Sequence, residues 1–245
     1  MNQQIVKAAE LIKNSKHTTV FTGAGISVES GISPFRGEGG VWNKYNEKVL
    51  DIEYFKNHPT ESWQVIRELF YNSILKAAPN EAHKALAELE KNGIVKAVIT
   101  QNIDNLHQLA GSLNVYEFHG TLMNLLCLKT GKKYFASEDY LAQLPPFSPD
   151  GGLLKPDCVF FGEGIPEEAY QASVNEAYVA DVFLIIGTTG EVFPAAQIPV
   201  IAKKNGAKVV EINPKPSNFT HQMTDIFIQD KAANALHLLK NLILK

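Results

Sequence analysis

Two glycines in this sequence stand where a nucleotide could be held. Gly23 and Gly25 come directly after the apolar run 18–22 and before a short stretch that we expect to be helical. Glycines at such a turn let the backbone approach a phosphate group, and the first N–H groups of a helix face the anion. Val28 stands where the full G-x-G-x-x-G motif has its last glycine. The spacing alone therefore fits a turn without a ligand equally well.

A second group of polar side chains follows another apolar run. Gln101, Asn102 and Asp104 come directly after residues 96–100. They could simply cap a helix, but so many polar groups at the carboxyl end of a strand favour a ligand site. His119 ends the next apolar run. A histidine there is more often structural than catalytic, although its ordinary pKa suits a general base near neutral pH.

A glycine-rich segment between these groups has the composition of a mobile loop. Residues 31–42, GISPFRGEGGVW, place Phe35 next to Arg36. An aromatic ring and a guanidinium on one loop could hold a ring and a phosphate. This pair favours the nucleotide interpretation of the two glycines.

The elements that must position these residues alternate along the chain. Short apolar runs predict strands at 18–22, 96–100, 114–118, 181–187, 207–213 and, more weakly, 225–228. Helical patterns lie at the N-terminus and at 60–76, 79–93, 194–205 and 231–243. Buried strands separated by helices predict a parallel sheet covered on both faces. We therefore predict an α/β fold, a Rossmann-like doubly wound parallel sheet with a smaller inserted module.

Two stretches depart from this alternation and suggest how the chain is divided. We expect residues 31–75 and 121–160 to form the small inserted module and a cofactor loop. The Rossmann-like domain then consists of residues 1–30, 76–120 and 161–245, and ligands are expected beyond the carboxyl ends of its strands.

Composition restricts the compartment and the partners. The 245 residues are 45% hydrophobic and 20% charged, which allows a sizeable core. A net charge of −3 without a basic block disfavours nucleic acid, and no run reaches the ~18–20 apolar residues that span a bilayer. The N-terminus has an amphipathic pattern and no signal-peptide core. Two cysteines, Cys127 and Cys158, suit a reducing compartment. We predict a soluble cytoplasmic protein without nucleic-acid or membrane partners and leave the oligomeric state open.

Several short motifs occur in one order between about residue 18 and the C-terminus. They are GAGIS, FRG, TQNIDNLH, FHG, FFGE, GTTGEVFPAA and INP. Together they resemble the sirtuin family, the NAD-dependent protein-lysine deacylases. The FRG loop is most similar to the bacterial deacetylase-type branch of that family. No single motif is decisive, but this many in register are highly specific.

The resemblance implies roles at the matching positions. NAD would be consumed as a co-substrate. Its phosphate and ribose would be contacted by Gly23, Ala24, Gly25 and Ile26, with Phe35 and Arg36 in the cofactor loop; Gln101 would lie at the nicotinamide ribose, and Asn102, Ile103 and Asp104 around nicotinamide. Gly187, Thr188 and Thr189 match the family's Gly-Thr-Ser with threonine in place of the usual serine, Asn213 would lie near the adenosine ribose, and Ala232 at adenine. His119 would be the general base, with Asn102 as a second catalytic residue.

The resemblance also implies the reaction and the second substrate. The acyl oxygen of a modified lysine would attack the ribose carbon as nicotinamide leaves, and His119 would then take a proton from a ribose hydroxyl. A dry pocket of Phe35, Ile103 and Phe161 would keep water out. The acyl-lysine peptide would add as a strand between two segments. Their residues are Val159, Phe160, Phe161, Gly162 and Glu163 in the first, and Gly190, Glu191 and Val192 in the second. Without the resemblance, 159–163 is better explained as a buried strand and a turn.

One departure from the family concerns zinc. Most sirtuins bind zinc with two Cys-x-x-Cys pairs, and four thiolates close a tetrahedral site. The matching positions here are Cys127, Thr130, Phe147 and Asp150, so one thiolate of four remains. We predict no zinc. The small module should then rest on apolar contacts, for which Leu126, Tyr134, Phe135 and Phe147 are candidates.

A second departure concerns the acyl group. Sirtuins that prefer acidic acyl chains carry Tyr-x-x-Arg on the helix that here reads SWQVIRELFYNSILKAAPN, and this helix has Arg67 but no tyrosine three residues before it. We predict deacetylation, or removal of a longer apolar acyl group, over desuccinylation.

Two other functions fit the scaffold: mono-ADP-ribosyl transfer to protein and a non-catalytic NAD-binding module. An ordinary dehydrogenase is disfavoured, because the ribose-binding acid expected ~20 residues after the glycines has no clear match: Glu47 lies near that spacing but in the lid-like segment.

Overall fold

Six parallel strands form the large sheet of this protein. The computed structural model describes residues 3–35 and 39–245. The strand order is β3-β2-β1-β7-β8-β9, with bounds Val115–Glu117, Val95–Thr100, Thr18–Thr22, Val182–Ile186, Lys208–Asn213 and Ile226–Gln229. Each apolar run predicted a strand whose observed bounds lie within a residue of the expectation. The four central strands, β2, β1, β7 and β8, are buried almost along their whole length, whereas the outer strands β3 and β9 are partly buried. The predicted α/β doubly wound fold is confirmed.

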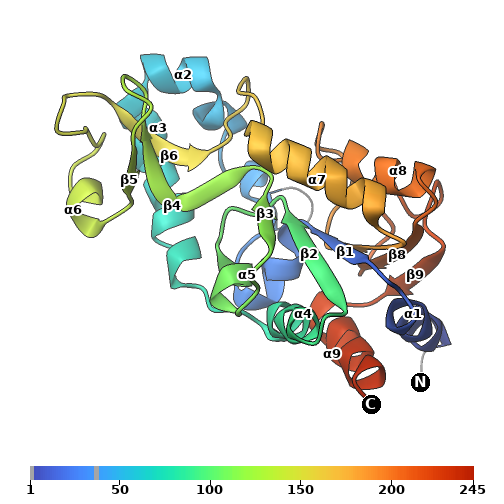
Figure 1. The fold of residues 1–245 in the computed structure, drawn as a ribbon. Helices are drawn as coiled ribbons and strands as arrows, with labels where there is room; N and C mark the ends of the chain where they lie inside the picture. Colours follow the sequence, from blue (N-terminus) through green and yellow to red (C-terminus); the bar gives the residue numbers. More distant parts are fainter. Residues whose placement is uncertain (1–2, 36–38) are drawn as a thin grey trace.

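Helices cover both faces of this sheet (Figure 1). On one face lie α1 (Gln3–Lys13), α4 (Glu81–Lys91) and α9 (Ala232–Ile243), whose apolar sides form one core with β1, β7 and β8. On the other lie α7 (Glu167–Val179) and α8 (Gln197–Lys204), packed on Phe21, Phe118 and Phe183. Strand order reverses between β1 and β7, which places a ligand crevice at their carboxyl ends.

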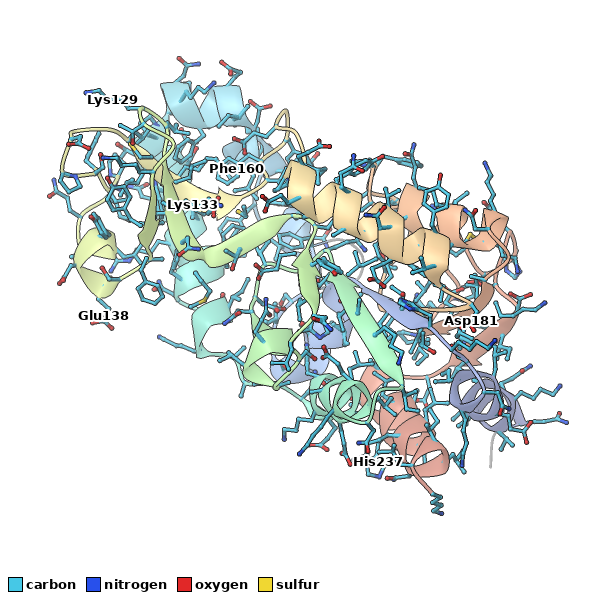
Figure 2. The ribbon with its side chains drawn as sticks, viewed as in Figure 1. Lys129, Lys133, Glu138, Phe160, Asp181 and His237 are labelled. Atoms are coloured by element: carbon cyan, nitrogen blue, oxygen red, sulfur yellow. The ribbon has the colours of Figure 1, made fainter. Side chains whose placement is uncertain are left out.

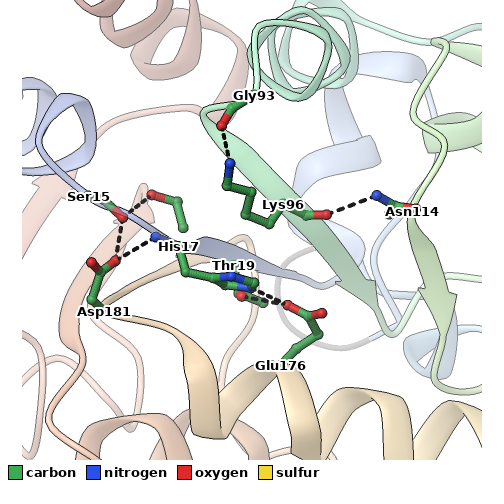
Figure 3. A network of polar contacts seen from close by, with 9 residues as sticks. Ser15, His17, Thr19, Gly93, Lys96, Asn114, Glu176 and Asp181 are labelled. Carbon is green, nitrogen blue, oxygen red and sulfur yellow. Dashed lines mark hydrogen bonds and ion pairs between the residues drawn. The ribbon is translucent and has the colours of Figure 1, made fainter.

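The amino end of β1 is fixed by a polar network that is shown in Figure 3. Asp181, just before β7, accepts hydrogen bonds from the Ser15 hydroxyl and from the backbone amide of His17. It also accepts one from the backbone amide of Lys16. The ring of His17 lies 2.7 Å from a carboxylate oxygen of Glu176 on α7. These contacts fix the amino end of β1 against β7 and α7. The glycine turn follows β1 at its opposite, carboxyl end.

A smaller antiparallel sheet lies to one side of the large one (Figure 1). Its strands, in the order β5-β4-β6, are Lys133–Phe135, Gly120–Cys127 and Leu154–Cys158. The short helices near it are α2 (Ile52–Asn57), α3 (Pro59–Ile66) and α6 (Glu138–Leu141), whereas α5 (Leu106–Leu109) lies beside α4 (Figure 1). The buried indole N–H of Trp63 donates to the backbone oxygen of Leu154 at 2.9 Å, so that α3 and β6 share one core.

The structure corrects several local predictions. The single helix predicted over 60–76 is divided into α3, a π-helical turn at Arg67–Tyr71 and a 3-10 turn at Ile74–Lys76. The expected helix after Gly25 is a 3-10 helix, Ala24–Ser30. Phe135 and Phe147, expected to pack the small module, are mostly exposed, and Leu126 is only partly buried. The core positions on β4 are Leu122, Leu125 and Cys127 instead.

Candidate active site

The turn after β1 meets the turn after β7 backbone to backbone. Gly23 donates its amide proton to the Ile186 oxygen at 3.0 Å, and Gly25 donates to the Gly187 oxygen at 2.8 Å. A Cβ atom on Gly25 would lie 2.6 Å from the Cα atom of Gly187, whose φ is +64°. The close contact between Gly25 and Gly187 is by itself enough to require glycine at both of these positions. The sequence interpretation assigned Gly25 to a phosphate, and the structure adds a packing requirement that it did not show.

A directed chain of hydrogen bonds ends on Asp104. The backbone N–H of Asn80 donates to Nδ1 of His83. Nδ1 is therefore the acceptor nitrogen of the ring, so Nε2 carries the proton and donates to the Ser27 hydroxyl at 3.5 Å. The Ser27 hydroxyl donates in turn to Asp104 Oδ2 at 2.7 Å. The Asn102 side chain donates to the same hydroxyl and to the Gly23 oxygen, both at 3.2 Å. Three segments far apart in the sequence thus fix one carboxyl group.

Burial sets the charge of this cluster. Burial raises the pKa of the Asp104 carboxyl, although hydrogen bonds from Ser27 and from the Leu106 amide oppose the shift. Burial lowers the pKa of His83 to about 4. It also lowers the pKa of His107, whose ring packs edge-on against His83 at 4.9 Å between centroids. Both imidazoles are therefore neutral near pH 7.

His119 is oriented by the end of the neighbouring strand. Its Nδ1 atom lies 3.1 Å from the backbone oxygen of Gln101. The Gln101 side chain donates to the Thr188 hydroxyl at 3.1 Å, and the backbone oxygen of His119 accepts from the amide of Val159 at 2.8 Å. Burial lowers the pKa of His119, and the hydrogen bond to Gln101 opposes this shift. His119 and Gln101 together thus connect the end of β2, the turn after β7 and the segment 159–163.

The other predicted residues beyond β7 and β8 are also linked. The Asn213 side chain donates to the Thr188 oxygen at 2.9 Å, and the Thr189 oxygen accepts from the amide of Asn218 at 3.0 Å. Ala232 is buried at the first residue of α9. These positions lie at the carboxyl ends of β7 and β8 and at the amino end of α9, as the sequence predicted for a Rossmann-like site.

A cavity of about 270 Å³ opens beside the Asp104 cluster. Five of the predicted site residues line it: Ala24, Phe35, Asn102, Ile103 and Asp104. Ser27 lines it too, as do Glu68, Leu69, Phe70 and Ile74 from the broken helix after α3. Apolar side chains and the buried Asn102 amide and Asp104 carboxyl meet here. Such a cavity suits a flat polar ring better than a free ion.

Some predicted residues are placed elsewhere. Phe161 is 43% exposed and does not line the cavity, so the expected dry pocket of Phe35, Ile103 and Phe161 is wrong in its last member. Phe160 is fully buried in the small module, where Figure 2 labels it. The Ile26 side chain is buried in the large core, so only its backbone can face a ligand. Arg36 lies outside the residues that the structure describes.

The two segments predicted for the peptide are held by backbone contacts. The Phe161 amide donates to the Leu50 oxygen at 2.8 Å, and its oxygen accepts from the Ile52 amide at 3.0 Å. In the second segment the Val192 oxygen accepts from the Ala196 amide at 2.9 Å, and Gly190 has φ +73° with the Phe219 ring against it. Gly162 and Glu163 belong to a turn after Phe161, and Glu191 is exposed.

The four positions that match zinc ligands do not form a metal site. Cys127 is fully buried, with its Sγ atom 3.5 Å from the Ser148 hydroxyl. Phe147 offers no donor atom, and Asp150 is exposed, with Lys132 3.8 Å away. In the described part of the chain, no three side chains of histidine, cysteine, aspartate or glutamate converge as metal ligands. These residues do not fit a structural zinc ion.

Sequence reasoning missed Ser27 and His83 as site residues. Ser27 follows the glycine turn directly, and His83 lies on the buried face of α4, four residues after Pro79. A histidine among the apolar residues of an amphipathic helix was the available signal, because a buried imidazole needs partners.

Comparison with known proteins agrees with this fold and site. The model of the Sir2 family matches residues 23–194. The chain is 47% identical over 236 residues to NAD-dependent protein deacylase 2 of the archaeon Pyrobaculum aerophilum, covering 94% of this chain and 92% of that one. The fold and the site thus define a Rossmann-like protein with a small inserted module. The chain belongs to the Sir2, or sirtuin, family.

Solved structures give the same result. One Sir2 enzyme structure is 44% identical, covers 100% of this chain and 99% of its own, and has a TM-score of 0.92. Another, described as a complex of Sir2 with a p53 peptide and NAD⁺, is 35% identical, covers 98% of each chain and has a TM-score of 0.89. Among residues 3–35 and 39–245 the helices are too short or too polar to cross a membrane.

Proposed function

We propose that this protein is an NAD-dependent protein-lysine deacylase that transfers the acyl group to ADP-ribose and releases nicotinamide. The observation that carries the proposal is the orientation of His119: its Nδ1 bonds to the Gln101 oxygen, which makes Nε2 the acceptor nitrogen of the ring. The curated relative is named a deacylase, and a related Sir2 structure holds both a peptide and NAD⁺.

The described residues suit NAD as a co-substrate. When bound, NAD supplies an electrophilic ribose carbon as nicotinamide departs. Asn102 and Asp104 would orient the nicotinamide amide in the cavity, and Phe35 and Ile103 would keep water from it. Gln101 and Thr188 would hold the adjoining ribose, and Asn213 would hold the adenosine ribose.

His119 has the protonation state that the transfer step needs. Its Nε2 would accept a proton from a ribose hydroxyl, which then attacks the acyl carbon; addition of one water molecule breaks the bond to the lysine nitrogen and leaves free lysine and O-acyl-ADP-ribose. The lowered pKa keeps the ring neutral, so the base is available near pH 7. The roles of Gly23, Gly25, Gly187, Thr189, Ala232 and both peptide segments remain part of this proposal.

We also propose an acetyl or longer apolar acyl group as the preferred substrate. The cavity residues from the broken helix are Leu69, Phe70 and Ile74 beside the acid Glu68. Lys44, the basic residue of the described lining, is paired with Glu68 at 3.3 Å. Among the described lining residues, a succinyl carboxylate would therefore meet only this paired lysine as a cation, and its burial would carry a desolvation penalty. Rates on acetyl-lysine and succinyl-lysine peptides test this, and faster desuccinylation would refute it.

Four finer points belong to the same proposal. The protein would hold no zinc, since the matching positions offer one thiolate, no donor at Phe147 and an exposed Asp150, and a measurement of near one zinc per chain would refute this. It would be cytoplasmic and would act without nucleic acid or membrane. The division into 1–30, 76–120 and 161–245 against 31–75 and 121–160 would separate the NAD-binding domain from the small module. A place in the bacterial deacetylase-type branch would rest on the FRG loop alone, because the relative above is archaeal.

The deciding experiment is mass spectrometry of an acetyl-lysine peptide incubated with the protein and NAD. We expect free lysine peptide, nicotinamide and O-acetyl-ADP-ribose. With His119→Ala we expect the free lysine peptide and O-acetyl-ADP-ribose to fall by about 10²–10⁴-fold, because His119 acts after nicotinamide has left. Label from NAD appearing on protein would instead support mono-ADP-ribosyl transfer. Nucleotide binding without nicotinamide release would support a non-catalytic NAD-binding module.

A further inference from the structure

A lysine is buried beside the segment proposed to bind the peptide. The Lys155 side chain, on β6, is only 2% exposed. Its ammonium lies 3.0 Å from the Pro156 oxygen, 2.6 Å from the Cys158 oxygen and 2.9 Å from a carboxylate oxygen of Glu163. The three protons of an ammonium thus meet three acceptors. A charge this well buried persists only where its partners are fixed.

The same carboxylate closes the turn that follows. Glu163 Oε2 accepts the amide proton of Phe160 at 2.8 Å, and the Glu163 amide donates to the Phe160 oxygen at 3.0 Å. The Lys155 ammonium also lies 4.4 Å from the centroid of the Phe160 ring, within the range of a cation–π contact. Lys155 therefore connects the carboxyl end of β6 to the turn 160–163 by two contacts: the ion pair with the Glu163 carboxylate and the cation–π contact with the Phe160 ring.

The segment between these two anchors touches the proposed general base. The Val159 amide donates to the backbone oxygen of His119 at 2.8 Å, and Phe161 pairs on its other side with Leu50 and Ile52. A shift of the turn 160–163 would therefore move a chain that is bonded directly to His119. The polar and ring contacts of Lys155 lie within residues 156–163, whereas the NAD side is reached indirectly, through His119 and its bond to Gln101, so the NAD side should feel the change much less.

We propose that Lys155 is a positioning residue for the acyl-lysine peptide: its buried ammonium holds the turn 160–163, and with it the segment 159–163, in register with His119. This inference rests on the proposed deacylase function, because that function gives the segment its substrate. It predicts that loss of the ammonium weakens the peptide side of the reaction and spares the NAD side.

The test compares Lys155→Met with Lys155→Arg, Glu163→Gln and the control Lys133→Met. Methionine keeps the length and the apolar contacts of the lysine, and Glu163, at 24% exposure, can turn to water when its partner is gone. Lys133 pairs with Asp157 at 2.8 Å in the same module, but its side chain is 62% exposed. The control therefore removes a lysine and an exposed ion pair without leaving a buried group unpaired. Figure 2 labels Lys133 and Phe160 in this module.

Two readouts are needed for each variant: KM for peptide and for NAD in steady-state turnover, and the Kd of a fluorescent acetyl-lysine peptide by anisotropy. We expect Lys155→Met to raise the peptide KM and Kd by about tenfold or more while the NAD KM changes by less than about twofold. Lys155→Arg, which keeps the charge, should recover part of the loss, and Lys133→Met should match the wild type.

The outcomes separate the inference from the function on which it rests. A folded Lys155→Met protein with wild-type peptide Kd overturns the inference, and so does an equal loss on the NAD and peptide sides. If Lys155→Met does not fold, Glu163→Gln carries the test, and its wild-type peptide Kd would overturn the inference. Absence of turnover in the wild type overturns the proposed function, and the anisotropy series then still decides whether Lys155 positions a bound peptide. A wild type that binds no peptide contradicts both.

Discussion

The Nδ1 atom of His119 lies 3.1 Å from the backbone oxygen of Gln101. A carbonyl oxygen can only accept, so Nδ1 carries the proton and Nε2 presents its lone pair. One hydrogen bond to the end of β2 thus fixes both the tautomer and the direction of the ring. This tautomer is the one that a general base at Nε2 requires.

This tautomer leads to a pH prediction. Burial lowers the pKa of His119 below the ordinary 6.5, so the acid limb of kcat/KM should have its apparent pKa below that value. We expect His119→Ala to reduce kcat by about 10²–10⁴-fold and to leave NAD binding intact. His221→Ala, at an exposed position, is the control. An acid limb above 6.5 would contradict the assignment of His119 as a desolvated base.

The contact between Gly25 and Gly187 predicts a large effect of one added methyl group. In Gly25→Ala the new Cβ would lie 2.6 Å from a backbone atom that cannot rotate away. We expect a loss of about 2–3 kcal/mol in the free energy of unfolding, measured by urea denaturation. Gly164→Ala is the matched control, because nothing lies within 4 Å of its added Cβ. Equal stability of the two variants would contradict the prediction and would mean that the turns after β1 and β7 can move apart at little cost.

The buried imidazole of His83 should make stability depend on pH. Its pKa is about 4 in the folded protein and 6.5 for an ordinary histidine, so the unfolded chain binds more protons between these values. The contribution of neutral His83 is complete above pH 6.5 and is lost as the pH falls toward 4. Its size is about 3 kcal/mol over this window.

The measurement is the free energy of unfolding at several pH values for His83→Asn and for His237→Asn. His237 is exposed on α9 and bonded to Asn241, and Figure 2 labels it. We expect the slope of stability against pH to fall in the first variant and to persist in the second. Some slope should remain in His83→Asn, because His107 is also buried and neutral. An unchanged slope in His83→Asn would contradict this account.

A buried carboxylate on β8 should act on NAD rather than on the peptide. Glu211 is fully buried and accepts from four groups that lie at the adenosine end of the proposed site: Asn213, Ser217, Thr220 and Thr224. The loop that it holds bonds to Thr189 through the Asn218 amide. We expect Glu211→Gln to lower stability by about 1–3 kcal/mol and to raise the KM for NAD by about tenfold with little change for peptide.

The control for this prediction is Glu81→Gln on α4. Glu81 pairs with Lys84 at 2.9 Å, but both side chains are more than half exposed, so the substitution should be near neutral. If Glu211→Gln raises the peptide KM instead, the loop serves the other side of the site. Together with Lys155→Met, this variant would assign the two substrates to the two ends of the crevice.

The sequence predicted the large sheet well and the small module poorly. The strands of the large sheet are continuous apolar runs, which a chain without tertiary information already shows. Helix α7 was not predicted, because its buried residues are Ser173 and Ala177 rather than an apolar stripe. The polar ends of β2 and β3 were visible as residue types. The chain from His83 through Ser27 to Asp104 was not, since its members meet only after folding.

The correction at Leu126 provides the last prediction. Successive residues of a strand face opposite sides, so an error of one residue exchanges core and surface. The pairing of β4 with β6 is irregular between Gly120 and Leu125, and after it Leu125 and Cys127 face the core. We expect Leu125→Ala to lower the free energy of unfolding by about 2–5 kcal/mol and Leu126→Ala by less than about 1 kcal/mol. Urea denaturation of the pair measures this, and an equal loss in both would mean that β4 is not held in the observed register.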